Sequence, residues 1–129
     1  MAKMMFPLAA AVAAIAAPQI AHAAGDPVVG GKMFIQCRAC HTINAGDRNG
    51  VGPNLNGVVG RKAGTRAGYS YSPAMTASGV AWTAVTLDAF LARPSAKVPG
   101  TKMAFAGVAA KKTRDDIIAY LASVPAPKR

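Results

Sequence analysis

Cys37-Arg38-Ala39-Cys40-His41 is the stretch of the chain with the most specific chemistry. Two thiols three residues apart on one helical turn reach the same side of a porphyrin and can form thioether bonds with its two vinyl groups. The adjacent histidine then lies under the macrocycle, with a ring nitrogen directed at the iron. The pattern C-x-x-C-H is typical of c-type haem attachment. We therefore expect the chain to fold around one covalently bound haem, attached at Cys37 and Cys40 and ligated by His41.

Three other kinds of site use the same residue types. A thioredoxin-like dithiol needs a βαβ context, of which the sequence shows no sign. A zinc site needs about four ligands, and beyond residue 23 the chain offers only two cysteines and one histidine as strong candidates. A structural disulfide between Cys37 and Cys40 is a further alternative, but it leaves His41 without a role. Haem attachment is the interpretation that uses all three side chains.

Length and composition limit the architecture around this stretch. The chain has 129 residues, of which 52% are hydrophobic, and its 15 Lys+Arg against 5 Asp+Glu give a net charge of +10. That length allows one domain and leaves little room for a second. The apolar content excludes disorder throughout the chain. No apolar run reaches the roughly 18 residues that suggest a transmembrane helix.

The first residues are typical of a secretory signal peptide. A basic start precedes an apolar, alanine-rich run over 6–17, Pro18 ends that run, and 21–23 (Ala-His-Ala) match a small-x-small cleavage site. The alternative is an uncleaved membrane anchor, for which the run is short. We expect residues 1–23 to be removed, export to the periplasm, and a mature domain of residues 24–129.

Capping residues and apolar spacing predict short helices joined by long loops. Asp26-Pro27 starts a first helix that runs to about Gln36, and the glycines Gly30 and Gly31 within it indicate the close approach of another helix. Residues 42–68 are rich in glycine and predict a loop.

Three more helices are predicted further along the chain. Two short ones begin after Ser72 and Thr83. Residues 113–116 (Thr-Arg-Asp-Asp) resemble a capping box and predict the start of a last helix, which Pro125 ends. Its apolar face is expected to hold Ile117, Tyr120, Leu121 and Val124. We expect the tail of residues 126–129 to be loose.

The second axial ligand is sought among the methionines, because removal of residues 1–23 leaves His41 as the only histidine. Met33 is expected in the core of the first helix, and Met75 lies in a short middle helix. Met103 follows Pro99-Gly100 in a turn-rich loop that can fold over a haem. Core packing is the ordinary alternative for each methionine, but the loop context favours Met103 as the ligand.

An ordered series of motifs between residues 25 and 124 is far more specific than C-x-x-C-H alone. It comprises 37–42, 52–57, 60–62, 68–72, Trp82, 99–107 and 118–121. In this order the motifs resemble those of class I c-type cytochromes, the family of mitochondrial cytochrome c and bacterial cytochrome c2. The resemblance implies an all-α cytochrome c fold. Short helices and long loops wrap around one covalently attached haem c, and the N- and C-terminal helices cross.

The resemblance also implies a set of site residues. His41 and Met103 are the axial ligands, and the carbonyl oxygen of Pro53 accepts a hydrogen bond from the other His41 N–H. The helix crossing matches Gly30, Phe34, Ile117 and Tyr120. The haem pocket is expected to include Pro53, Arg61, Tyr71, Ser72, Met75, Trp82, Phe90, Thr101 and Phe105.

Three positions depart from the family pattern. Only two residues separate Phe34 from Cys37, as in bacterial relatives. Met75 stands where the family often has asparagine, and Phe90 where it often has tyrosine. The last two changes make the expected pocket more apolar, and they remove no ligand.

By this resemblance the chain is a monomeric one-electron carrier and not an enzyme. A haem ligated by both His41 and Met103 leaves no site for a substrate. The donor is expected to be a bc1-type complex and the acceptor a terminal oxidase, a photosynthetic reaction centre or a reductase. The alternative is a small haem enzyme or gas sensor in which Met103 is displaced.

The positive charge predicts how the carrier docks. Basic side chains around the exposed haem edge are expected to steer it to acidic membrane redox complexes. The alternative is a solvated basic surface without a special partner, and export argues against nucleic acid as that partner. The expected docking residues are Lys32, Arg38, Lys62, Lys97, Lys102, Lys111 and Lys112.

Overall fold

Helices and loops make up the part of the chain that the computed structural model describes, residues 25–125. The predicted signal peptide (1–23) and the predicted loose tail (126–129) lie outside the described residues. Between residues 25 and 125, the only β pairing is an isolated antiparallel bridge between Lys62 and Ala81. No helix in this range is long and apolar enough to cross a membrane. The elements are α1 (Pro27–Met33), the 3-10 helix η1 (Phe34–Gln36), α2 (Pro73–Ala77), α3 (Ala84–Ala92), α4 (Pro94–Lys97) and α5 (Lys111–Ser123).

The helix starts follow from local capping, as predicted. The Asp26 carboxylate accepts hydrogen bonds from the backbone N–H groups of Val28 and Val29 at the start of α1. The Ser72 hydroxyl accepts one at the start of α2. At the start of α3, the side chains of Thr83 and Thr86 each accept a hydrogen bond from the other's backbone N–H. Each cap satisfies a backbone donor that has no partner within its helix.

The start of α5 differs from the prediction. The helix begins at Lys111, and Ala110 stands at its N-cap without a side-chain hydrogen bond. Thr113 and Asp116, expected as the first residue and the acidic residue of the capping box, both lie inside the helix. Asp115 and Asp116 pair with Lys111 and Lys112 one turn earlier. Asp116 also accepts a hydrogen bond from the backbone N–H of Asp26, at 2.7 Å. The predicted capping box is therefore wrong, because these carboxylates serve helix surface pairs and a contact with the start of α1.

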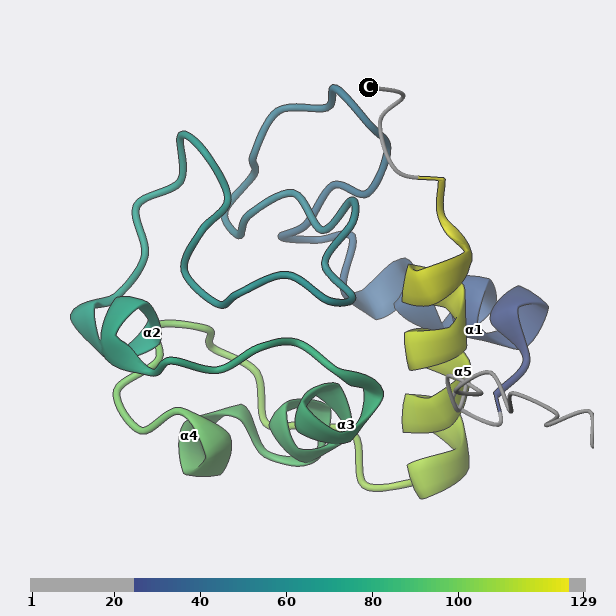
Figure 1. Cartoon of the computed structure of the whole chain (residues 1–129). Coiled ribbons are helices and arrows are strands. Elements are labelled where there is room, and N and C mark those ends of the chain that lie inside the picture. Colours follow the sequence, from purple (N-terminus) through teal and green to yellow (C-terminus); the bar gives the residue numbers. More distant parts are fainter. Residues whose placement is uncertain (1–24, 126–129) are drawn as a thin grey trace, which may run out of the picture.

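The first and last helices pack against each other, as the resemblance implies. Figure 1 shows α1 and α5 together on one side of the molecule, with α2, α3 and α4 on the other. The rings of Phe34 and Tyr120 lie 5.3 Å apart between their centroids. Phe34 and Ile117 are each only 1% exposed. Gly30 lies directly against the backbone of Asp116, which explains the glycine inside α1.

Met33 is not a core residue, contrary to the expectation from the sequence. Met33 is 39% exposed. Gly30 and Phe34 form the buried side of this segment, and Met33 precedes Phe34 by one residue, which corresponds to a rotation of about 100° around the helix axis. Met75, by contrast, is buried on α2.

Candidate functional site

A large cavity lies between α3, α5 and the loops that carry His41 and Met103. Its volume is about 630 Å³, within the range typical of cofactor and small-molecule sites. Leu87, Phe90 and Leu91 of α3 line one part of it, and Ile117 and Leu121 of α5 line another. The walls are therefore mostly apolar, and a hydrophobic group is the kind of ligand they suit.

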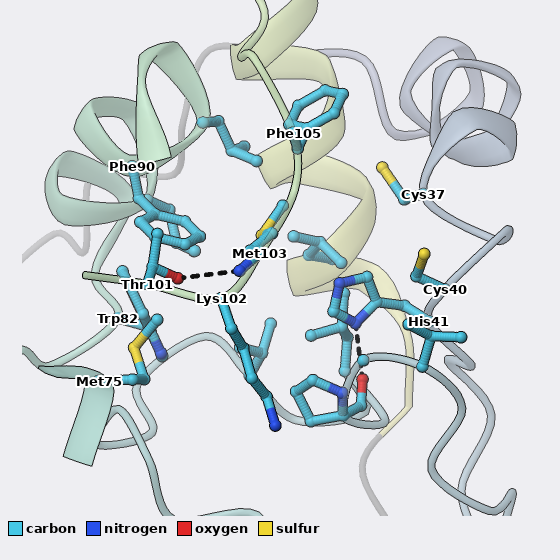
Figure 2. A pocket seen from close by; sticks show the side chains of 18 of the residues that line it. Cys37, Cys40, His41, Met75, Trp82, Phe90, Thr101, Lys102, Met103 and Phe105 are labelled. Atoms are coloured by element: carbon cyan, nitrogen blue, oxygen red, sulfur yellow. Dashed lines mark hydrogen bonds between the residues drawn. The ribbon is translucent and has the colours of Figure 1, made fainter. Parts of the chain in front are cut away.

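Two thiols lie on one side of the cavity. Cys37 follows η1 directly, and the backbone N–H groups of Cys40 and His41 both donate to its carbonyl oxygen, which sets one tight turn. Cys37 is half-buried, Cys40 is exposed, and neither forms a disulfide among the described residues. Burial raises the pKa of the Cys37 thiol. Figure 2 shows both sulfur atoms on the same side of the cavity as His41. The disulfide alternative therefore finds no support here.

The His41 ring is held by a hydrogen bond between its Nδ1 and the carbonyl oxygen of Pro53, at 2.7 Å. Because a carbonyl oxygen only accepts, Nδ1 carries the hydrogen, and Nε2 remains available as a ligand. Burial lowers the pKa of His41, and the bond to Pro53 acts in the opposite direction. A neutral imidazole is the form that binds a metal. The His41 ring is thus oriented for ligation, and its lowered pKa favours the neutral form.

Met103 lies on another wall of the same cavity. It belongs to the segment of residues 98–110, which joins α4 to α5 and which we call the Met103 loop. Its backbone N–H donates to the Thr101 hydroxyl at 3.3 Å. Figure 2 shows the Met103 side chain near the centre of the view, between Phe90 and Thr101 on one side and the two cysteines on the other. The sequence-predicted thioether is therefore available to a group bound in the cavity.

All of the predicted pocket residues line this one cavity. Arg61 donates to the carbonyl oxygens of Asn56, at 2.9 Å, and Asn54, at 3.2 Å. The rings of Trp82 and Phe90 lie 4.9 Å apart between their centroids. The complete set is Pro53, Arg61, Tyr71, Ser72, Met75, Trp82, Phe90, Thr101 and Phe105.

Of the seven predicted docking residues, Lys102 alone is among the residues that line the cavity. Its ammonium group lies 4.6 Å from the centre of the Tyr69 ring and donates to the Ser70 carbonyl oxygen. Two others, Lys111 and Lys112, pair with carboxylates of α5.

The remaining four docking residues lie outside the cavity wall. Arg38 donates to the Tyr120 hydroxyl at 3.4 Å. The other three are exposed and form no ion pair within residues 25–125, namely Lys32, Lys62 and Lys97.

Some residues of the cavity wall were not singled out from the sequence. Gly52 lies against the His41 ring, and the hydroxyl of Tyr69 donates to the Val51 carbonyl oxygen at 2.8 Å. Gly52 and Tyr69 fall within the motifs at 52–57 and 68–72, so the resemblance could have identified them as cavity residues. Nothing in the sequence marked Val51 as a cavity residue, because a valine in a glycine-rich loop has no distinctive pattern.

The residues present fit a covalently attached haem. Two thiols and an imidazole lie together, a thioether faces the same cavity, and apolar side chains fill most of the remaining wall. Thiolate, imidazole and thioether are the side chains through which proteins hold haem and its iron. Among residues 25–125, no group of three or more His, Cys, Asp or Glu side chains is arranged to hold a metal ion directly. The zinc alternative therefore has no ligand set in this part of the chain.

Comparisons with known proteins all point to one family. The family model for cytochrome c matches residues 28–125. A cytochrome c2 from Rhodomicrobium vannielii is 52% identical over 103 residues, which are 80% of this chain and 82% of that protein. The structure of cytochrome cH from Methylobacterium extorquens is 50% identical, with a TM-score of 0.73, over 77% of this chain and 99% of that one. Cytochrome c2 from Rhodospirillum centenum is 34% identical, with a TM-score of 0.75, over 80% and 100% of the two chains.

Proposed function

The chain belongs to the cytochrome c family, and from that premise we propose that it shuttles electrons through the periplasm from a bc1-type complex to an oxidase, a reaction centre or a reductase. As a member of this family it has the cytochrome c fold and carries one covalently attached haem c. It is an electron carrier and not an enzyme.

The ligand assignment rests on one observation: a hydrogen-bonded imidazole and a thioether face the same cavity from different walls. In the proposal, Cys37 and Cys40 would hold the haem through thioethers, and His41 and Met103 would ligate its iron. When bound, the haem supplies a reversible one-electron change at its iron. Pro53 orients the His41 ring and makes it a stronger donor, and Met103 raises the reduction potential relative to a second histidine.

The pocket side chains exclude water from this site. Met75, Trp82 and Phe90 are each less than 10% exposed, and all three line the cavity. Burial and low polarity around a haem are among the means by which a protein sets its potential. With His41 and Met103 both as ligands, the iron would have no position left for a substrate, which supports a carrier over the alternative of a haem enzyme or gas sensor.

Location and partners are supported by the sequence. Residues 1–23 have the pattern of a cleaved signal peptide, which supports export. The excess of 15 Lys+Arg over 5 Asp+Glu supports rapid association with acidic membrane complexes. Lys102 is exposed and lines the cavity, so its charge lies where a partner would approach the haem.

Optical spectra of the ferric holoprotein test the function and its ligands. We would produce the full chain together with haem-maturation machinery and look for the weak far-red band of iron–sulfur ligation. We expect the band in the parent and its loss in Met103→Ala. Met33→Ala is the matched control and should keep the band, because Met33 is outside the cavity. Covalent haem without the band in the parent would contradict the carrier and favour the enzyme or sensor. A protein mass without haem would favour a dithiol protein.

A further inference from the structure

Backbone hydrogen bonds attach the Met103 loop to the helices at its two ends. At its start, the backbone N–H of Val98 donates to the carbonyl oxygen of Pro94 in α4, at 2.9 Å. Near its end, the backbone N–H of Val108 donates to the carbonyl oxygen of Leu91 in α3, at 2.8 Å. Met103 lies between these points, next to Lys102, whose ammonium group donates to the Ser70 carbonyl oxygen. Its position therefore depends on that contact and on how firmly the end of the loop is attached to the helices.

The side chain of Arg114, in α5, forms hydrogen bonds with the end of this loop. Its Nη1 donates to the carbonyl oxygens of Val108 and Ala109, each at 2.8 Å. Among residues 25–125, it is the only side chain outside the loop that hydrogen-bonds to the loop's backbone. Its side chain is only 11% exposed, so these bonds are largely shielded from water. Hydrogen bonds from a charged donor are stronger than those between neutral groups.

Asp88 of α3 holds Arg114 in this orientation. The Nε of Arg114 donates to Asp88 Oδ1 at 2.8 Å. Arg114 therefore binds Asp88 and the loop carbonyl oxygens through different nitrogen atoms, Nε and Nη1. Asp88 also lies 3.7 Å from the ammonium group of Lys111. The planar guanidinium therefore connects α3, α5 and the Met103 loop at one point, which a flexible single ammonium does not reproduce.

The loop end also fits closely against α3. Gly107 has a φ of +118°, and a Cβ atom there would lie 2.1 Å from the carbonyl oxygen of Ala92. The same stretch of α3 contributes Phe90 and Leu91 to the cavity wall. A change in how the loop end sits on α3 is thus transmitted to the part of the cavity that Met103 faces.

We propose that Arg114, held by Asp88, is a positioning residue for Met103: it fixes the end of the Met103 loop and so keeps the thioether in the cavity. The inference rests on the proposed function, because it takes Met103 to be the axial ligand. Arg114 does not line the cavity and touches no ligand of the haem. It acts through the loop backbone, by lowering the fraction of molecules in which the loop is detached.

Imidazole binding to the ferric holoprotein measures this fraction, with loss of the far-red band as the readout. Imidazole binds only after the Met103 thioether has moved away, so its apparent affinity rises with the population of the detached loop. In Arg114→Gln we expect the affinity for imidazole to rise about tenfold or more, because two hydrogen bonds from a charged donor are lost.

Two further variants keep the proposal testable if Arg114→Gln does not fold. Arg114→Lys keeps a positive charge near Asp88, but its single ammonium group cannot bind Asp88 and the loop carbonyl oxygens in the same geometry. We therefore expect a smaller rise in imidazole affinity than in Arg114→Gln. In Asp88→Asn the charge that orients Arg114 is removed, and we expect the affinity for imidazole to rise as well.

Asp26→Ala is the matched control for global stability. It removes the cap of α1 and lowers the melting temperature, but Asp26 has no hydrogen bond to the Met103 loop. We expect it to bind imidazole as the parent does. If imidazole affinity instead follows the melting temperature in all variants, Asp26→Ala included, the proposal is overturned. Parent-like affinity in Arg114→Gln overturns it too. A parent that lacks the far-red band contradicts the ligand assignment itself and removes both proposals.

Discussion

Gly30 of α1 and Asp116 of α5 are in backbone contact at the helix crossing. A Cβ atom built on Gly30 would lie 1.8 Å from the Asp116 carbonyl oxygen and 2.8 Å from the Cβ of Tyr120. Since the first contact is with backbone, no side-chain rotation can relieve it. The absence of a side chain at one position therefore sets how closely the two terminal helices approach.

We expect Gly30→Ala to lower the free energy of unfolding of the holoprotein by about 3 kcal/mol or more, because the helices must move apart. Gly31→Ala is the matched control. Its Cβ would meet the Tyr120 ring at 3.2 Å, and the better helix propensity of alanine, worth about 1 kcal/mol, offsets that contact. Denaturant unfolding measures both variants. If both variants lost the same free energy of unfolding, the loss would come from placing alanine in α1 and not from the contact between α1 and α5.

Gly52 is expected to matter for the orientation of His41. A Cβ atom on Gly52 would lie 2.4 Å from Cε1 of the His41 ring. In Gly52→Ala we expect the ring to be displaced, which alters the ferric and ferrous haem spectra and costs about 3 kcal/mol of stability. Optical spectra and denaturant unfolding of the holoprotein check both effects.

Gly46→Ala is the control for Gly52→Ala. Gly46 has a φ of +85° and open space around it, so alanine there costs about 1–2 kcal/mol through backbone strain alone. We expect its haem spectra to match those of the parent. Spectra that change equally in the two variants would argue against a specific role for Gly52.

The Asp88–Arg114 pair predicts a loss of stability in acid. The hydrogen bond from Arg114 lowers the pKa of Asp88 in the folded protein. A carboxyl with a lowered folded-state pKa stabilises the protein above its unfolded-state pKa, about 4, and this contribution is lost as the pH falls through the folded-state value. We expect Asp88→Asn to cost about 1–2 kcal/mol at pH 7 and much less at pH 3.

Denaturant unfolding at pH 7 and pH 3 measures this difference. Asp47→Asn is the control, because Asp47 is exposed and forms no ion pair among residues 25–125. We expect its stability to follow that of the parent at both values. A cost for Asp88→Asn that does not change with pH would contradict an ionic contribution from this pair.

Docking is expected to depend on Lys102 more than on Lys111. Lys102 lines the cavity, whereas the charge of Lys111 is offset by Asp88 and Asp115. With a bc1-type complex as donor, we expect Lys102→Gln to lower the rate constant for reduction by roughly 2–5-fold at low ionic strength, and Lys111→Gln to change it little. Stopped-flow kinetics over a range of salt concentrations measure both. For the parent the rate should fall as salt rises, and a flat response would contradict electrostatic steering.

The sequence by itself determined the features of this protein that depend on neighbouring residues. The helix starts at Asp26, Ser72 and Thr83 were predicted correctly, because each cap bonds to backbone within three positions. The fold class was predicted because an ordered series of motifs is specific to one family. The assignment of the axial ligands and pocket roles stays a prediction, although all the residues concerned line one cavity.

Only the tertiary structure decided which distant partners the charged and apolar side chains find. Asp116, expected to cap its own helix, accepts from Asp26, which is 90 positions away. Arg114 carried no signal in the sequence, yet it joins α3 to the Met103 loop. Met33 has the chemistry of a core residue and is exposed. Such outcomes depend on how the helices pack, because a long side chain reaches whatever group the fold brings within hydrogen-bonding distance, and no local pattern records that group.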